Sequence, residues 1–263
     1  MTDYQHLLPI AIQAIELAHD LVKQPVKTVT VKSDRDMVTD VDYNIERTVR
    51  RFLQERTPDI GFLGEEDGID YAATSLMWAL DPVDGTANFT HGLPLHAVSL
   101  GLMHGTRSVL GVIDLPQLNS RYTAAEGSGA FENGQPIHAS QVSALDQAVV
   151  AIGDYALGPT GAERNKRRLR ITAELSARAQ RVRMFGSAAI DLAWLAAGRI
   201  DGSIMLSNNP WDTCAGVAIA REAGAVVMDD DGSEHTAKSR ATVAAAPHLR
   251  EQILALVNES CLS

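Results

Sequence analysis

The pattern of apolar residues changes twice along this chain, and that change limits the folds it can adopt. Segments 7–22 and 45–53 repeat apolar side chains every three or four positions, as amphipathic helices do. Between residues 76 and 125 the apolar residues form short runs separated by Gly, Pro, His or Asn, which is typical of strands. After residue 148, strand-like and helix-like segments alternate. We therefore expect an α/β sandwich of layered sheets and helices.

Residues typical of turns separate these segments and mark where each expected strand or helix begins and ends. The expected strands are 76–80, 97–103, 109–113, 122–125, 148–152, 181–184, 204–206, 226–228 and 241–245. The expected helices of the second part are 160–179, 187–197, 212–223 and a last one that starts at Pro247. Thr39 and Asp42 form a capping box pattern at the start of the second amphipathic helix. The chain is expected to form one domain in two halves, 1–140 and 141–263.

Length and charge narrow the classes of function. The 263 residues carry 23 basic and 33 acidic side chains, a formal net charge of −10, which argues against nucleic-acid binding and against binding to an anionic membrane. Acidic substrates remain possible, because bound metal ions can reverse a local field. No segment reads as a signal peptide or a membrane span, so we expect a soluble, cytoplasmic protein. Two cysteines, Cys214 and Cys261, are too few for a disulfide framework or a cysteine zinc site.

The strongest local motif is Asp81-Pro82-Val83-Asp84-Gly85-Thr86, directly after an apolar run. Two carboxylates three residues apart, with a proline between them, can point at one place. Together with the carbonyl of Val83 they suit a hard divalent cation such as Mg²⁺. Gly85 allows close approach to an anion, and a helix that starts near Thr86 would offer its free N–H groups to a phosphate. An ordinary Asp-Gly turn explains the same segment equally well.

Three further acidic segments are weak when each is taken alone. Residues 64–68, Gly-Glu-Glu-Asp-Gly, also fit a solvated loop. Residues 36–42 contain the capping box already described. Trp211-Asp212 stands at the head of an expected helix, where Asp212 could simply be the N-cap residue.

Taken together and in this order, these segments resemble the inositol monophosphatase family of Mg²⁺-dependent, lithium-sensitive phosphatases. The family pattern of Gly-Glu-Glu, then Asp-Pro-x-Asp-Gly-Thr-x-Asn-Phe, then Trp-Asp matches residues 64–66, 81–89 and 211–212. The flanking matches are Val38-Thr39 with Asp42, 91–94, 186–189 and 222–225. The likeness covers nearly the whole chain, and its nine-residue core motif is specific.

The resemblance implies a five-layered α/β/α/β/α sandwich of the inositol monophosphatase and fructose-1,6-bisphosphatase type. It also implies a homodimer, with an active site between the two halves. By position, Glu65, Asp81 and the Val83 carbonyl would hold a first Mg²⁺, and Asp81, Asp84 and Asp212 a second. Glu65 would reach a third Mg²⁺ through water, which gives two to three ions per subunit.

The same resemblance implies roles in catalysis and in substrate binding. Glu65 and Thr86 would orient a metal-activated water for in-line attack without a phosphoenzyme, and Asp42 would accept the Thr86 proton. The backbone N–H groups of Gly85 and Thr86 would hold the phosphate. The full set of expected substrate-binding residues is Asp84, Gly85, Thr86, Gly186, Ser187, Ala188, Met205 and Asp212.

The choice of substrate is left open by the sequence. Inositol 1-phosphate is the expected family substrate, with histidinol phosphate, a sugar bisphosphate or adenosine 3′,5′-bisphosphate as alternatives. A regulatory protein without catalysis is a further alternative, which the retained acidic residues argue against. Family members that act on inositol phosphate commonly have Glu seven residues before the Trp-Asp aspartate, where this chain has Met205. We therefore expect a relaxed preference, unless Asn208 or Asn209 supplies the missing hydrogen bond.

Eight of the 23 basic residues fall between Arg164 and Arg183. A solvated helix face, a dimer rim and a nucleic-acid patch are all compatible with this cluster. The acidic balance of the whole chain favours the first two.

Overall fold

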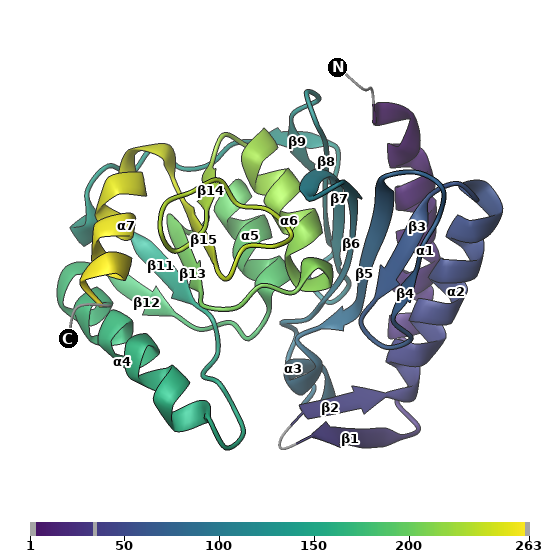
Figure 1. Cartoon of the computed structure of the whole chain (residues 1–263), viewed down its shortest axis with the longest axis horizontal. Helices are drawn as coiled ribbons and strands as arrows, with labels where there is room; N and C mark the ends of the chain where they lie inside the picture. The colour runs from purple at the N-terminus through teal and green to yellow at the C-terminus, as the bar shows by residue number, and fades with distance from the viewer. Residues whose placement is uncertain (1–3, 34–35, 261–263) are drawn as a thin grey trace.

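The computed structural model describes residues 4–33 and 36–260, which form five layers (Figure 1). Helices α1 (Leu8–Val22) and α2 (Asp40–Arg56) cover one face of a large sheet. Helices α5 (Ala188–Ala196) and α6 (Pro210–Glu222) lie between that sheet and a smaller one. Helices α4 (Gly161–Arg178) and α7 (Arg250–Glu259) cover the outer face of the smaller sheet. This order of layers agrees with the expected α/β/α/β/α sandwich.

The large sheet has the strand order β10-β9-β8-β7-β6-β5-β3-β4 among the described residues. Its strands are β3 (Gly61–Gly64), β4 (Ile69–Asp70), β5 (Leu76–Asp84), β6 (Ala97–His104), β7 (Arg107–Leu115), β8 (Ser120–Ala125), β9 (Ala130–Glu132) and β10 (Gln135–Ile137). Neighbouring strands are antiparallel except for β3 and β5, which run parallel. Short helix α3 (Thr86–Thr90) follows β5 directly.

The smaller sheet has the order β12-β11-β13-β15-β14 in the part of the chain that the structure describes. Its strands are β11 (Val149–Ile152), β12 (Arg181–Arg183), β13 (Gly202–Met205), β14 (Val226–Met228) and β15 (Thr242–Ala245). A separate hairpin pairs β1 (Val29–Ser33) with β2 (Asp36–Thr39), and single 3₁₀ turns occupy Gln5–Leu7, Leu145–Gln147 and Pro247–Leu249.

Two glycines let helix α6 lie close against the large sheet. A Cβ at Gly111 would stand 2.2 Å from the carbonyl oxygen of Ala215, and one at Gly101 would stand 2.4 Å from Sγ of Cys214. Any larger residue at either position would push the helix outward. Because Asp212 lies in the first turn of α6, this close packing also fixes how near Asp212 comes to the strands that face it.

Each segment expected to be a strand or a helix is one in the structure, but some begin or end at other residues than predicted. Strand β5 continues to Asp84, because its pairing with β6 resumes at Asp84 after a bulge, whereas the sequence predicted an end at Leu80. Helix α6 begins at Pro210, so Asp212 is its third residue. The alternative explanation, in which Asp212 is the N-cap residue, was wrong. The sequence missed the hairpin β1–β2 and the short strands β3, β4, β9 and β10.

Two minor predictions can also be compared with the structure. Cys214 is buried, whereas Cys261 lies outside the described residues. Within residues 4–33 and 36–260, none of the helices is long and apolar enough to cross a membrane.

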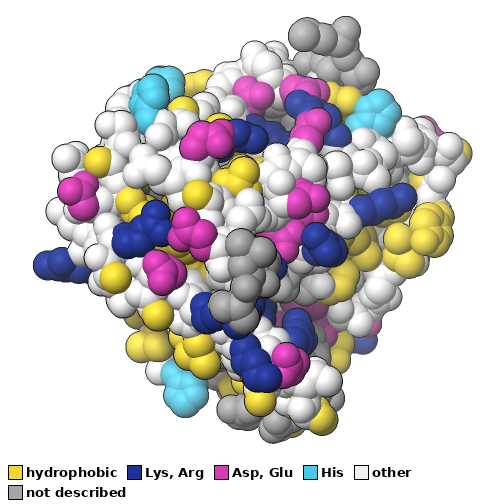
Figure 2. Space-filling view, turned by 60° about the vertical axis from the view of Figure 1, so that its left-hand side comes forward, with side chains coloured by type: hydrophobic (Ala, Val, Ile, Leu, Met, Phe, Trp, Pro, Cys, Tyr) yellow, Lys and Arg dark blue, Asp and Glu magenta, His cyan; other side chains and the backbone are white. Residues whose placement is uncertain are grey.

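The basic segment between Arg164 and Arg183 is less exposed than the sequence suggested. Arg167 pairs with Asp230 at 2.6 Å, Arg178 pairs with Glu259 at 2.9 Å, and Arg168 is buried. Figure 2 brings the side of α4 and α7 forward and shows basic and acidic side chains intermixed over it. A uniformly solvated helix face was therefore the wrong interpretation for Arg168, which is buried and donates to the backbone carbonyls of Arg164 and Leu206.

Candidate active site

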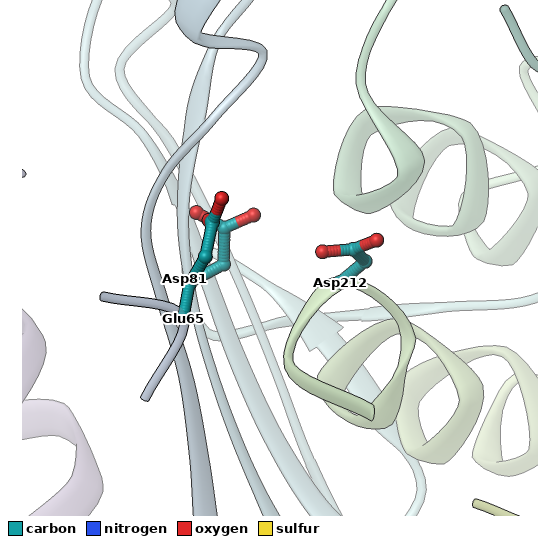
Figure 3. A group of neighbouring side chains, drawn as sticks. All are labelled: Glu65, Asp81 and Asp212. Carbon is teal, nitrogen blue, oxygen red and sulfur yellow. The ribbon is translucent and has the colours of Figure 1, made fainter. Parts of the chain in front are cut away.

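An open, polar cavity of about 460 Å³ lies where the large sheet meets the start of α6. We call it the catalytic cleft, and its lining residues are Glu65, Asp81, Val83, Asp84, Gly85, Thr86, Asn209, Trp211 and Asp212. Carboxylate oxygens of Glu65, Asp81 and Asp212 lie within 4.8 Å of one another. Figure 3 shows Asp212 reaching from the start of α6 toward the other two. Three oxygen ligands this close could hold a hard cation such as Mg²⁺.

Parallel pairing of β3 with β5 explains why Glu65 meets Asp81. Gly64, the last residue of β3, pairs with Leu80 of β5, so the residues that follow this pair, Glu65 and Asp81, lie side by side. Asp81 is buried, and its Oδ1 accepts the backbone N–H of Val83 at 3.0 Å, which fixes the carboxylate. The sequence motifs therefore converge through strand register.

Asp84 is oriented differently from the other acidic residues of the cleft. Its carboxylate accepts the Ser187 hydroxyl and the Ala189 N–H, each at 2.6 Å, and the Ala188 N–H at 3.3 Å. Ser187 is the N-cap residue of α5 and also accepts the N–H of Ile190. Asp84 is thus held at the N-terminus of α5, which favours a negative charge.

Gly85 and Thr86 form the turn that leads into α3. Gly85 has a φ of 88°, and a Cβ there would lie 3.0 Å from the Leu95 carbonyl oxygen, so glycine suits the turn on both counts. The Thr86 hydroxyl donates to the Val83 carbonyl at 3.0 Å. Asp42 completes the predicted capping box and accepts both the N–H and the hydroxyl of Thr39. The Thr86 hydroxyl and Asp42 each have another hydrogen-bond partner here, and the contact between them that the resemblance implies stays a prediction.

Burial and mutual repulsion act on the acidic groups of the cleft. Burial, followed by the charge of Glu65, raises the pKa of Asp81 well above its ordinary value. Burial and then the charge of Asp84 do the same to the pKa of Asp212. Burial raises the pKa of Asp84 to about 6, although the donors at α5 oppose it. Such an excess of buried negative charge is what a bound cation would relieve.

Glu46, which sequence reasoning missed, holds the loop that carries Glu65. It is fully buried on α2, and its carboxylate accepts the backbone N–H groups of Glu66 and Asp67, both at 2.8 Å. Arg50 pairs with it at 2.8 Å one turn later. A Cβ at Gly64 would stand 2.1 Å from Oε1 of Glu46, which explains the glycine. The available signal was an acidic residue inside the apolar stripe of α2, four residues before an arginine.

A second cavity, of about 160 Å³, opens beside the cleft and shares Asp84 and Asp212 with it. We call it the side pocket. Its remaining lining residues are Gly153, Asp154, Arg168, Gly186, Ser187, Ala188, Asp191, Met205, Leu206 and Ser207. The structure thus places the predicted residues Gly186, Ser187, Ala188 and Met205 together, and adds three charged residues that no motif indicated.

Neither asparagine lines the side pocket beside Met205. The Asn208 amide donates to the carbonyls of Thr236 and Ser239, at 3.2 and 3.0 Å, and its oxygen accepts from Thr213. Asn209 lines the catalytic cleft and donates to Asp212 at 3.0 Å. Met205 is buried at the end of β13 and presents an apolar surface to the side pocket.

Comparison with known proteins agrees with this geometry. The sequence model of the inositol monophosphatase family matches residues 3–262. The chain belongs to the inositol monophosphatase family. It is 37% identical over 229 residues to inositol-1-monophosphatase ImpA of Mycolicibacterium smegmatis, covering 87% of this chain and 83% of that one. It is 35% identical over 225 residues to a fructose-1,6-bisphosphatase/inositol-1-monophosphatase of Thermotoga maritima, covering 86% and 84%.

Solved structures of the family have the same fold. The extragenic suppressor protein suhB of Bartonella henselae superposes with a TM-score of 0.90 at 30% identity, over 97% of this chain and 99% of that one. An IMPase of Thermotoga maritima superposes with a TM-score of 0.88 at 31% identity, over 98% of both chains. This chain is therefore a phosphomonoesterase of a metal-dependent family, with the predicted fold.

Proposed function

We propose that this chain hydrolyses phosphate monoesters of cyclitols or sugars, such as inositol 1-phosphate, with the help of Mg²⁺. The observation that carries the proposal is the approach of Glu65, Asp81 and Asp212 to within 4.8 Å, at the entrance to a pocket large enough for a small alcohol. A phosphate monoester is a dianion, and these carboxylates would repel it unless a cation lay between them.

The residues present fit Mg²⁺. All candidate ligands are oxygens, and burial followed by the charges of neighbouring carboxylates raises the pKa values of Asp81 and Asp212. Glu65, Asp81 and the Val83 carbonyl would hold one ion and Asp81, Asp84 and Asp212 another, with two to three ions per subunit. When bound, Mg²⁺ would neutralise the phosphate and lower the pKa of a coordinated water.

The chain's own groups would bind the ester and direct the attack. The N–H groups of Gly85 and Thr86 would hold the phosphate oxygens, and Glu65 and Thr86 would orient the attacking water. The oxygen of this water would bond to phosphorus opposite the leaving oxygen, whose bond to phosphorus breaks. The leaving oxygen would take a proton from solvent water in the open cleft, and the alcohol would depart into the side pocket. Asp42 would accept the proton only if the Thr86 hydroxyl exchanges its Val83 acceptor for Asp42.

Further properties of the proposal rest on the family resemblance alone. We expect a homodimer, inhibition by Li⁺ and a cytoplasmic location, with residues 1–140 and 141–263 as two halves that both contribute to the site. Light scattering of the purified chain would test the dimer, and an assay with Li⁺ present would test the inhibition.

The second candidate substrates are histidinol phosphate and the bisphosphates of sugars or nucleotides. Met205 favours these substrates over inositol 1-phosphate, because its apolar side chain lines the side pocket and cannot accept a hydrogen bond from an inositol hydroxyl.

Phosphate release from a panel of monoesters tests the proposal. Inositol 1-phosphate, glycerol 2-phosphate, histidinol phosphate and adenosine 3′,5′-bisphosphate would each be assayed with Mg²⁺ and again with excess chelator. We expect Mg²⁺-dependent release from several of them. If no ester releases phosphate, the proposed phosphatase activity is contradicted. If phosphate is released in excess chelator, the proposed dependence on Mg²⁺ is contradicted.

A further inference from the structure

The side pocket contains a buried guanidinium that lacks an acidic partner. Arg168 on α4 is only 5% exposed. Among the described residues, its hydrogen bonds go to two backbone carbonyls, Leu206 at 3.1 Å and Arg164 at 3.4 Å. Burying a charge without a countercharge is costly unless something compensates it.

The neighbouring arginines of the same helix show the usual solution. Arg167 pairs with Asp230 at 2.6 Å, and Arg178 pairs with Glu259 at 2.9 Å. Burial, and then the charges of Arg164 and Arg167, lower the pKa of Arg168, which is the direction expected for a cation that lacks a countercharge. Arg168 differs from its neighbours because it lines a cavity next to the cleft.

The acidic residues of the side pocket do not pair with Arg168 in the described chain. Asp84 is held at α5, and Asp212 faces Glu65 and Asp81. Asp191 is buried and accepts the Ser203 hydroxyl at 3.2 Å. Asp154 is exposed to solvent and would suit a hydroxyl donor of a ligand. The positive charge of Arg168 therefore remains available to a ligand.

We propose that Arg168 binds an anionic group on the alcohol part of the substrate, so that the preferred esters carry a carboxylate or a second phosphate beside the one that is removed. The inference rests on the proposed function, since it assumes that the ester lies in the catalytic cleft with its alcohol in the side pocket. A guanidinium makes charge-assisted hydrogen bonds to either anion.

Two matched pairs of substrates test this inference and separate the two anions. The first pair is 2-phosphoglycerate and glycerol 2-phosphate, which differ by a carboxylate. The second is fructose 1,6-bisphosphate and fructose 1-phosphate, which differ by a phosphate. We expect kcat/KM for the acidic member of at least one pair to exceed that of its neutral partner by roughly tenfold or more, mainly through KM.

Three variants separate charge recognition from a merely structural role of Arg168. Arg168→Gln keeps a donor for the Leu206 carbonyl but removes the charge, and should reduce the preference to near one. Arg168→Lys keeps the charge and should retain part of the preference. Arg164→Gln removes an exposed charge one turn away, outside the pocket, and should leave the preference unchanged.

The outcomes distinguish this inference from the proposed function. If the chain hydrolyses the neutral esters but prefers neither acidic partner, the Arg168 inference is overturned and the phosphatase stands. If Arg168→Gln keeps a full preference, the arginine is structural and the inference is also overturned. If inositol 1-phosphate is hydrolysed but neither member of either pair is, the Arg168 inference is overturned; if no ester of the panel or of the pairs is hydrolysed, the proposed function itself fails. Should Arg168→Gln not fold, the wild-type ratios and Arg168→Lys still decide.

Discussion

The catalytic cleft and the side pocket share two aspartates, yet the rest of their residues differ in origin. The cleft is lined by contiguous motif residues at the ends of β3 and β5 and at the start of α6. The side pocket is lined by the short stretches 153–154, 186–188 and 205–207 and by Arg168 and Asp191, and of these only 186–188 belongs to a matched motif. If the proposed roles are correct, motif residues perform the reaction, whereas substrate choice depends mainly on residues outside the motifs. Changes in the cleft should therefore affect every substrate alike, and changes in the side pocket should affect substrates unequally.

The largest effect within this comparison is expected at Thr86. Thr86→Ala removes the hydroxyl that would orient the water, so turnover should fall by about a hundredfold or more, the scale of a positioned proton-transfer group. The loss should be equal for all esters of the panel, while Mg²⁺ binding measured by calorimetry persists. Near-normal turnover would show that Thr86 does not orient the water, and a loss confined to one ester would show that a change in the cleft does not affect all substrates alike.

A change in the side pocket should instead alter one substrate. Met205→Glu restores a hydrogen-bond acceptor at the end of β13, so kcat/KM for inositol 1-phosphate relative to glycerol 2-phosphate should rise by about ten- to a hundredfold. Met205→Leu is the matched control and should leave that ratio unchanged. If Met205→Glu changes kcat/KM equally for both esters, residue 205 does not contribute to substrate preference.

Glu46 tests how strongly the cleft depends on its buried support. Glu46→Gln keeps the size of the side chain but removes the charge that pairs with Arg50 and accepts the N–H groups of Glu66 and Asp67. The free energy of unfolding should fall by about 1–3 kcal/mol, and Mg²⁺ affinity by about tenfold, because Glu65 loses its fixed position. Glu55→Gln, an exposed position on the same helix, serves as control. An unchanged Mg²⁺ affinity with lowered stability would limit Glu46 to a structural role.

The smallest expected effect is a pH dependence of stabilisation by Mg²⁺. A carboxyl whose pKa is raised on folding stabilises the fold at low pH and loses that contribution as pH rises through its folded pKa. The raised pKa of Asp84, about 6, and those of Asp81 and Asp212 therefore make the metal-free fold weaker above pH 6. Mg²⁺ replaces the protons, so its gain in melting temperature should grow by a few degrees between about pH 5 and pH 8. A gain that shrinks with pH would contradict the convergence of these carboxylates.

The same comparison explains what the sequence could and could not predict. The alternation of helices and strands followed from apolar periodicity. The five layers and the shared site of Glu65 and Asp81 followed from the family resemblance, because the pairing of β3 with β5 joins two segments that no local pattern connects. The ends of β5 and α6 did not, because a bulge and a proline at the first helical position set them. Short strands such as β4, with two exposed residues, carry no apolar pattern at all.

Residues that act through burial were hidden from sequence reasoning. Glu46 lies within the apolar stripe of α2, but the loop that it holds is known only from the packing of that helix. Arg168 looks like a surface residue of a charged helix, and only the packing of α4 shows that it is buried. The metal, catalytic and substrate-binding roles of the predicted residues remain predictions, as does the boundary near residue 140. The comparisons confirm the family and the fold to which those predictions belong.

Calorimetric titration of Mg²⁺, read beside phosphate release from the same samples, tests the central claim most directly. The claim is that Glu65, Asp81 and Asp212 form a cation site on which hydrolysis depends. The wild-type chain should bind two to three Mg²⁺ ions and release phosphate, and Asp81→Asn should lose the tightest binding and the turnover together. Asp231→Asn, a change in an exposed turn, should lose neither. Wild-type turnover that persists in excess chelator, or an Asp81→Asn variant that keeps both properties, would contradict the account.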